Sequence, residues 1–240
     1  MKKLCSLLIL ILLSMTAAAC TDPTYGNPGS DQNGQQPGSA GAEKKALFVG
    51  TDSANDRIVM KHLKELGFEV TLESDKELTE DHAQKYGLVY VSSFAGSHRV
   101  AGKLLASSAP VIYANGKILG EVGLASKDDS DYGDYTGRTI TVHESKHPLA
   151  VGLEGEVDIY KADGKIGFVV PQGGDIIASA PDDDKRAVIC AFEKGTKNMI
   201  GQPVPARRLY FNLTGGEEIN RTDDGWKLFD AAVRWATDKG

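Results

Sequence analysis

Residues 109–123 read APVIYANGKILGEVG, and this stretch decides how the rest of the chain is interpreted. An apolar run of strand length breaks at the polar pair Asn115-Gly116, and a segment that can start a helix follows. Several enzyme families mount a catalytic nucleophile on such a strand–turn–helix junction. Two questions follow: whether the flanking sequence repeats this unit, and whether the turn carries a nucleophile.

The sequence before this stretch repeats the unit. Apolar runs of strand length occur at residues 45–50, 68–73 and 87–93. Helical periodicity occurs between them over residues 55–67, where Gly67 is a natural terminator, and over residues 98–107. The run at 87–93 is apolar almost throughout, as in strands that are buried on both faces of a parallel sheet. The alternation predicts an α/β protein with a flavodoxin-like, doubly wound and mostly parallel sheet.

The sequence changes character after Gly123. Residues 125–137, ASKDDSDYGDYTG, are acidic and rich in turn formers, and they predict a surface loop. Short strand-like runs follow at residues 138–144, 157–162, 166–170, 175–181 and 186–195. They predict a β-rich C-terminal extension or insertion, after which residues 207–213 return to the central sheet. A final amphipathic helix is expected over residues 222–238, with Thr222 as its N-cap.

Four segments carry a resemblance to a known family. They are KHPLAVGLEGEVDIY (146–160), RAVICAFEKG (186–195), VPARRLYFNL (204–213) and DDGWKLFDAAVRWA (223–236). Together they resemble the class I glutamine amidotransferase-like superfamily, in particular domains of secreted bacterial proteins related to its trehalose-utilisation-type branch. The resemblance covers roughly residues 44–238 and implies the same flavodoxin-like sheet. Its segments mark the fold and imply no activity.

The resemblance also implies where catalytic residues would lie. Amidotransferases of this superfamily carry a cysteine at the turn after the strand that corresponds to PVIYAN, and a histidine on a late strand. Here the turn reads Tyr113-Ala114-Asn115-Gly116 and the late strand ends Phe211-Asn212-Leu213-Thr214. A nucleophile of this kind needs an adjacent base. Both are absent from these positions, so we expect no amidotransferase chemistry and assign no catalytic residue.

Other polar groups fall where strands of the predicted sheet end, and the carboxyl ends of parallel strands line the ligand crevice of such folds. The candidate lining residues are Asp52, Ser53, Ser93, His98, Asn115 and Asn212. Ser93, His98 and Asp52 could assemble a non-standard hydrolase set. Alternatively, Ser53 and Asp56 form a helix-capping box, and Ser92, Ser93 or Ser97 caps the helix after the third strand. The capping interpretation is favoured.

The remaining polar residues suggest no metal or cofactor. The acidic stretch 128–134 lacks the spacing and closing glutamate of a helix–loop–helix calcium site. His143 and His147 flank the sequence HESKH, but this spacing alone does not define a metal site. We expect His62 to be solvated, Cys190 to be buried, and one of Arg207 and Arg208 to pair with a carboxylate while the other faces solvent.

The N-terminus predicts export. Residues 1–19 have two lysines, a short apolar core and small residues at the end, as in a secretory signal peptide. Residues 17–20, AAAC, resemble the lipobox of bacterial lipoproteins, which implies that Cys20 is lipidated and holds the protein to the membrane. Residues 21–42 are rich in Gly, Pro, Ser, Asn and Gln and predict a disordered tether of about 25 Å. The folded domain is then residues 43–240.

Composition narrows the partners. The chain has 27 basic and 33 acidic residues, a net charge of −6, which becomes −8 once Lys2 and Lys3 leave with the signal peptide. An acidic chain is a poor ligand for nucleic acid. The leading hypothesis is a cell-surface lipoprotein whose inactive amidotransferase-like domain binds a carbohydrate or an envelope protein. The alternatives are a hydrolase built on the Ser93, His98 and Asp52 set, and a purely structural envelope protein.

Overall fold

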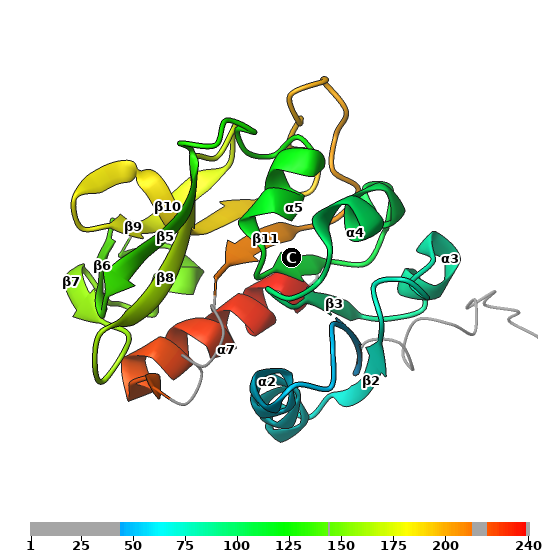
Figure 1. Ribbon diagram of the computed structural model, residues 1–240, viewed down its shortest axis with the longest axis horizontal. Helices are drawn as coiled ribbons and strands as arrows, with labels where there is room; N and C mark the ends of the chain where they lie inside the picture. The colour runs from blue at the N-terminus through cyan, green and yellow to red at the C-terminus, as the bar shows by residue number, and fades with distance from the viewer. Residues whose placement is uncertain (1–43, 144, 213–219, 239–240) are drawn as a thin grey trace, which may run out of the picture. The chain divides into compact units, whose positions relative to one another are not determined.

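A computed structural model describes residues 44–143, 145–212 and 220–238. The predicted signal peptide, the lipidated Cys20 and the tether lie outside the described residues, as do Glu144, Leu213 and Thr214. The first half of the described chain and its last strand form a parallel sheet (Figure 1). Its strands are β1 (Lys45–Val49), β2 (Glu69–Glu73), β3 (Leu88–Val91), β4 (Val111–Tyr113) and β11 (Arg208–Phe211).

The strand order β2-β1-β3-β4-β11 confirms the predicted fold class. Each neighbouring pair in this set is parallel. The order matches the flavodoxin-like arrangement 2-1-3-4-5, in which the chain changes direction across the sheet between its first and third strands.

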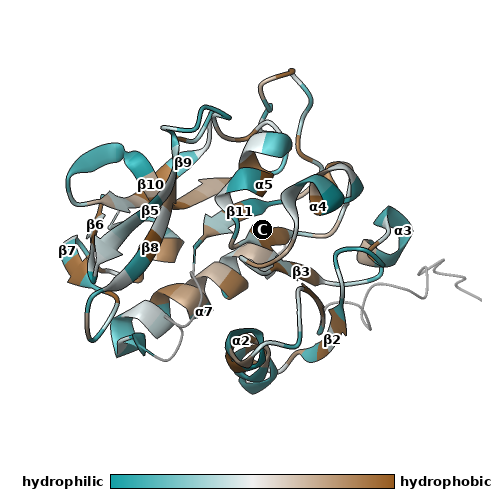
Figure 2. Cartoon of the chain, in the orientation of Figure 1, coloured by the Kyte–Doolittle hydropathy of each residue, from teal (hydrophilic) through white to brown (hydrophobic). Residues whose placement is uncertain are grey.

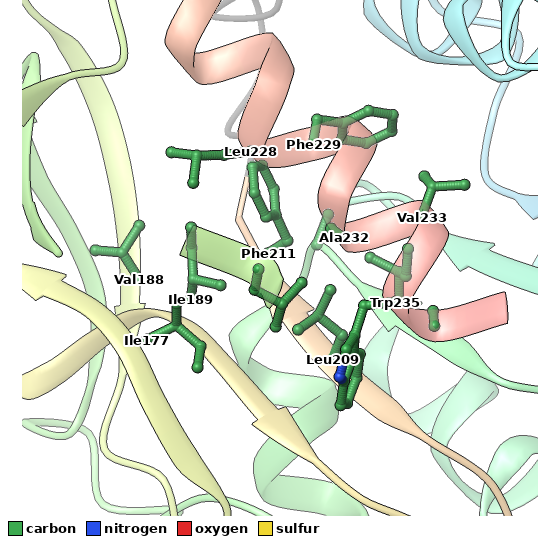
Figure 3. Packing of buried hydrophobic residues seen from close by; sticks show 14 of the residues in the cluster. Ile177, Val188, Ile189, Leu209, Phe211, Leu228, Phe229, Ala232, Val233 and Trp235 are labelled. Atoms are coloured by element: carbon green, nitrogen blue, oxygen red, sulfur yellow. The ribbon is translucent and has the colours of Figure 1, made fainter. Parts of the chain in front are cut away.

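Helices cover both faces of the sheet, as a doubly wound fold requires. They are α2 (Ala54–Glu65), α3 (Glu80–Ala83), α4 (Ser97–Leu104), α5 (Gly116–Glu121) and α7 (Asp223–Thr237), with a 3-10 turn η1 (Pro148–Ala150). Because side chains alternate along a strand, Phe48 of β1 packs with α2 and α7, whereas Leu47 packs with α3, α4 and α5. Figure 3 shows the first core, where Phe229 and Val233 of α7 lie over Leu209 and Phe211 of β11.

The β-rich part is inserted between α5 and β11. Its strands are β5 (Tyr132–Gly137), β6 (Thr139–Val142), β7 (Gly155–Asp158), β8 (Gly164–Val169), β9 (Asp175–Ala180) and β10 (Asp183–Phe192). β10 runs antiparallel to β11 and joins these strands to the parallel sheet. The insertion was one of the two placements that the sequence allowed.

The prediction of a surface loop over residues 125–137 is wrong in its second half. Residues 132–137 form β5, which pairs with β8 along its whole length. The apolar pattern of this stretch is too sparse to indicate a strand, because the pairing partner and not the pattern provides the stability. Tyr132 and Tyr135 are three positions apart, so they point to opposite faces of β5 and join different cores.

Arg208 corrects a second expectation. Arg207 pairs with Glu193 at 2.9 Å, as expected for one of the two arginines. Arg208 does not face solvent: it is 1% exposed at the start of β11. Its guanidinium donates to five backbone carbonyls, those of Leu104, Ser107, Ala109, Ala206 and Arg207, at 2.6–3.3 Å. It therefore ties the end of α4 to the starts of β4 and β11.

The last helix begins where the sequence placed it. The hydroxyl of Thr222 accepts a hydrogen bond from the backbone N–H of Gly225 at 3.0 Å, which is the N-cap arrangement. Figure 2 shows the apolar stripe that α7 turns toward the sheet. Within the described ranges, no helix combines the length and the apolar character needed to cross a bilayer.

Candidate functional site

The carboxyl-terminal edge of the parallel sheet is the candidate site, because the polar residues singled out from the sequence follow the ends of β1, β3, β4 and β11. Each of these side chains can be tested for whether it is free to act on a ligand or is already bonded within the protein. Most of them are bonded to the backbone of neighbouring loops.

Asn115 occupies the position of the missing nucleophile, and its amide is fully engaged. The side-chain Nδ2 donates to the carbonyls of Ser93 and Ala95 at 3.2 and 2.9 Å. Its Oδ1 accepts from the N–H of Lys117 at 3.1 Å, which caps α5. The residue has φ −125° and ψ 111°, ordinary extended values without the strain of a nucleophile elbow. Asn115 thus fastens the turn after β4 to the turn after β3.

Ser53 and Asp56 confirm part of the capping interpretation. The Ser53 hydroxyl accepts from the N–H of Asp56 at 3.1 Å and caps α2. The buried carboxylate of Asp56 does not return to Ser53; it accepts from the N–H and hydroxyl of Thr51 at 2.8 and 2.9 Å and from the Ser92 hydroxyl at 2.6 Å. The sequence showed Asp56 only as a capping residue and missed its role in joining the loops after β1 and β3.

Asp75 is a second carboxylate that sequence reasoning missed. Its Oδ2 accepts from the N–H of Gly96 at 2.6 Å and from Arg99 at 2.9 Å. Gly96, with no side chain to contribute, is the N-cap of α4, so the serines expected there do not cap this helix. The hydrogen bond from Arg99 outweighs desolvation and lowers the pKa of Asp75. Asp75 therefore stays ionised and holds the loop after β2 against α4.

The three residues of the alternative hydrolase set are not assembled. Asp52 forms two hydrogen bonds of 2.7 Å with the guanidinium of Arg57, and the hydrogen bonding lowers the pKa of Asp52. His98 lies exposed in the first turn of α4. Within the described ranges, no hydrogen bond joins Ser93 to His98 or His98 to Asp52. A serine nucleophile needs a base within hydrogen-bond reach, which this arrangement does not provide.

Asn212 lies where the resemblance would place the catalytic histidine. Its side chain is buried and its Nδ2 donates to the hydroxyl of Tyr210 at 2.8 Å. A Cβ atom on Gly167 of β8 would overlap this amide, so β8 approaches Asn212 as closely as a glycine allows. The position is part of the packing between β11 and β8 and does not open onto the edge of the sheet.

The other histidines also serve local structure. His62 is not solvated as expected: its ring stacks on Trp226 at 4.1 Å and its Nε2 lies 2.6 Å from Asp230, so it joins α2 to α7. His143 Nε2 lies 2.8 Å from the Ser179 hydroxyl, whereas His147 caps η1 through Leu149. The two histidines of HESKH therefore have different partners.

An open groove lies away from all of these residues. It has a volume of about 900 Å³ and is bounded by β6, β7 and the start of α7. Its lining is mostly polar: Arg138, Thr139, Leu153, Glu154, Glu156, Val157, Asp158, Thr222, Asp223 and Asp224. None of the candidate lining residues predicted from the sequence contributes to it. In size and polarity the groove suits a hydrophilic ligand better than an apolar one.

Comparison with known proteins supports the fold and nothing finer. No family model and no curated protein matches the chain. Among solved structures, a match is the crystal structure of a Thermoplasma acidophilum protein described as a candidate GMP synthase component of the amidotransferase type. The TM-score is 0.50 at 12% identity, and the match covers 79% of this chain and 92% of that chain. The chain therefore has a class I glutamine amidotransferase-like fold.

Proposed function

We propose that this chain is a lipid-anchored protein of the bacterial cell envelope whose amidotransferase-like domain is catalytically inactive and serves as a binding or accessory module. One observation carries the proposal: the amide of Asn115, at the nucleophile position, is bonded to three backbone groups. The buried Asn212 and the separated Ser93, His98 and Asp52 support it further. A place in the trehalose-utilisation-type branch is part of the proposal and rests on the sequence resemblance.

Asn115→Cys is the direct test of inactivity. The thiol cannot replace the cap on α5 or the two bonds to the loop after β3, so we expect the free energy of unfolding to fall by about 1–2 kcal/mol. We also expect no ammonia release from glutamine by either the parent protein or the variant, because Asn212 cannot accept the thiol proton. Steady-state ammonia assays and denaturant unfolding measure the two effects. Glutamine hydrolysis by the parent protein that is lost in an Asn115→Ala variant would refute the proposal.

The lipid anchor can be tested by counting thiols. Cys190 is fully buried, and burial raises the pKa of its thiol, so it should not react in the folded protein. If Cys20 is lipidated and Cys5 is removed with the signal peptide, the native protein should show no reactive thiol and the denatured protein one. Simple cleavage after Ala19 would instead leave a fast-reacting Cys20 thiol in the native state. Cys20→Ala should abolish lipid labelling, and labelling that persists would contradict the assignment.

The binding role concerns an envelope partner, either a glycan or a protein. Tyr132 and Tyr135 point to opposite faces of β5 and offer no shared platform for a sugar ring, so the groove beside β7 is the better location for a hydrophilic ligand. A thermal-shift screen of the full mature chain against glycans and cell-wall fragments tests this. A ligand that raises the melting temperature supports the role, and a panel without any shift counts against a small ligand.

A further inference from the structure

The loop between β10 and β11, residues 193–207, exposes two large apolar side chains. Met199 is 59% exposed and Ile200 is 72% exposed, the highest values among the large hydrophobic residues that the described part of the chain exposes. We call this pair the apolar tip. Figure 1 shows the loop extending outward beyond α4 and α5, and Figure 2 shows its outermost turn in brown. Exposure of adjacent apolar residues on a projecting turn indicates a contact surface.

The apolar tip is held rigidly. Asn198 is buried, and its Nδ2 donates to the carbonyl of Val122 at the end of α5. Its Oδ1 accepts from the N–H groups of Ile200 and Gln202 at 3.2 and 2.9 Å. The N–H of Met199 donates to Gly123, and that of Gly201 donates to the Asn198 carbonyl, both at 2.8 Å. Four consecutive backbone donors are thus satisfied inside the protein.

These internal bonds matter because an unsatisfied backbone group costs several kcal/mol in hydrocarbon. A turn whose N–H groups are already bonded can enter a water-free medium with much less penalty than an open turn. The ordering cost has also been met in the fold, because Asn198 fixes the turn on α5. The apolar tip is therefore suited to insertion and not only to exposure.

The charge around the apolar tip is positive, in contrast to the acidic chain as a whole. Lys194 and Lys197 are exposed on the same loop. Its one acidic residue, Glu193, is paired with Arg207 at 2.9 Å. The outer part of the loop therefore presents two cations beside two apolar side chains, which complements an anionic lipid surface.

The topology places this loop at the edge of the sheet where the tether joins the domain. β11 is parallel to β4, β4 to β3, and β3 to β1. The starts of β1 and β11 therefore lie at the same, amino-terminal edge. The chain enters β1 from the tether at Lys45, and the loop leads into β11 at Arg208. A membrane anchor before residue 45 would bring this edge toward the bilayer.

We propose that the apolar tip inserts into an anionic phospholipid surface as a second, weak membrane contact. The inference rests on the proposed lipid anchor, which keeps the loop near the bilayer and makes a weak contact effective. Two side chains are far fewer than the 20–30 residues that each partner contributes to a typical stable protein interface, roughly 800 Å² a side, whereas they suffice for a tethered lipid contact. Insertion would turn the carboxyl-terminal edge of the sheet away from the membrane.

The test uses the full mature chain, residues 20–240, with Cys20→Ala and an N-terminal histidine tag that binds nickel-chelating lipid in phosphatidylglycerol-rich vesicles. Because this tether replaces the natural lipid, failure of the lipoprotein assignment and failure of this inference are separate results. An environment-sensitive fluorophore on Gln202→Cys reports on the tip, and the buried Cys190 stays unlabelled. The same fluorophore on Lys185→Cys, exposed at the opposite end of β10, is the matched control.

We expect the emission of the Gln202→Cys probe to shift to the blue and to be quenched by lipid-borne quenchers, while the Lys185→Cys probe stays in water. Met199→Ser together with Ile200→Ser should reduce the inserted population at least about tenfold. Lys194→Gln and Lys197→Gln, or neutral phosphatidylcholine vesicles, should reduce it about fivefold for each lysine.

Two outcomes would overturn the inference. One is an aqueous signal from the Gln202→Cys probe on anionic vesicles with the apolar tip intact. The other is a probe shift that the two serine substitutions leave unchanged. A shift that needs a soluble envelope protein and no vesicles would assign the apolar tip to protein docking and would equally exclude the lipid contact.

Discussion

Replacing Arg208 with methionine is expected to lower the free energy of unfolding by at least about 3 kcal/mol. The side chain is 1% exposed and supplies hydrogen bonds to five backbone carbonyls. A buried acceptor left without a donor costs about 1–3 kcal/mol, and the last carbonyls of α4 have no intrahelical partner. Desolvation lowers the pKa of Arg208, but an arginine remains charged at neutral pH.

Denaturant unfolding monitored by circular dichroism measures this loss. Arg208→Lys should recover less than half of it, because an ammonium group cannot reproduce the planar fork that reaches several carbonyls at once. Arg57→Met is the matched surface control: its ion pair with Asp52 is exposed, and its loss should cost no more than about 1 kcal/mol. Equal effects of the Arg208 and Arg57 substitutions would show that the five carbonyls find other partners.

The parallel half of the fold could be predicted because its signals are local. Its strands are continuous apolar runs, its helices have clear periodicity, and Thr222 and Ser53 cap helices as their sequence positions indicate. β5 was missed because its stability comes from pairing with β8, about thirty residues further along the chain. Arg208 was misplaced because the sequence cannot show that five carbonyls from three segments converge on one guanidinium.

The candidate site could be located from the sequence but not interpreted. Strand ends fixed the position of Asn115, yet its partners belong to the preceding loop. Asp56 and Asp75 were overlooked because an aspartate near a helix start reads as a cap whichever loop its carboxylate reaches. Where a polar side chain sits depends on the local sequence; what it binds depends on tertiary contacts.

Two helical glycines provide the sharpest case, since the same substitution should have opposite effects at them. A Cβ atom added to Gly102 in α4 meets nothing within 4 Å. Gly102→Ala should therefore raise the free energy of unfolding by about 1 kcal/mol, the difference in helix propensity. A Cβ atom on Gly225 in α7 would lie 2.6 Å from the carbonyl oxygen of Ile159 and 2.5 Å from Arg221 Cγ.

Gly225→Ala should accordingly lower the free energy of unfolding by about 2 kcal/mol despite the gain in helix propensity, because a backbone oxygen cannot move aside as a flexible side chain can. The same carbonyl of Ile159 accepts the N–H of Thr222 at 2.9 Å, so the clash would also disturb the start of α7. The two variants should differ by about 3 kcal/mol in denaturant unfolding. Stabilisation by Gly225→Ala would mean that α7 does not approach the strand after β7 as closely as the structure indicates, and the packing of α7 on this side of the sheet would need revision.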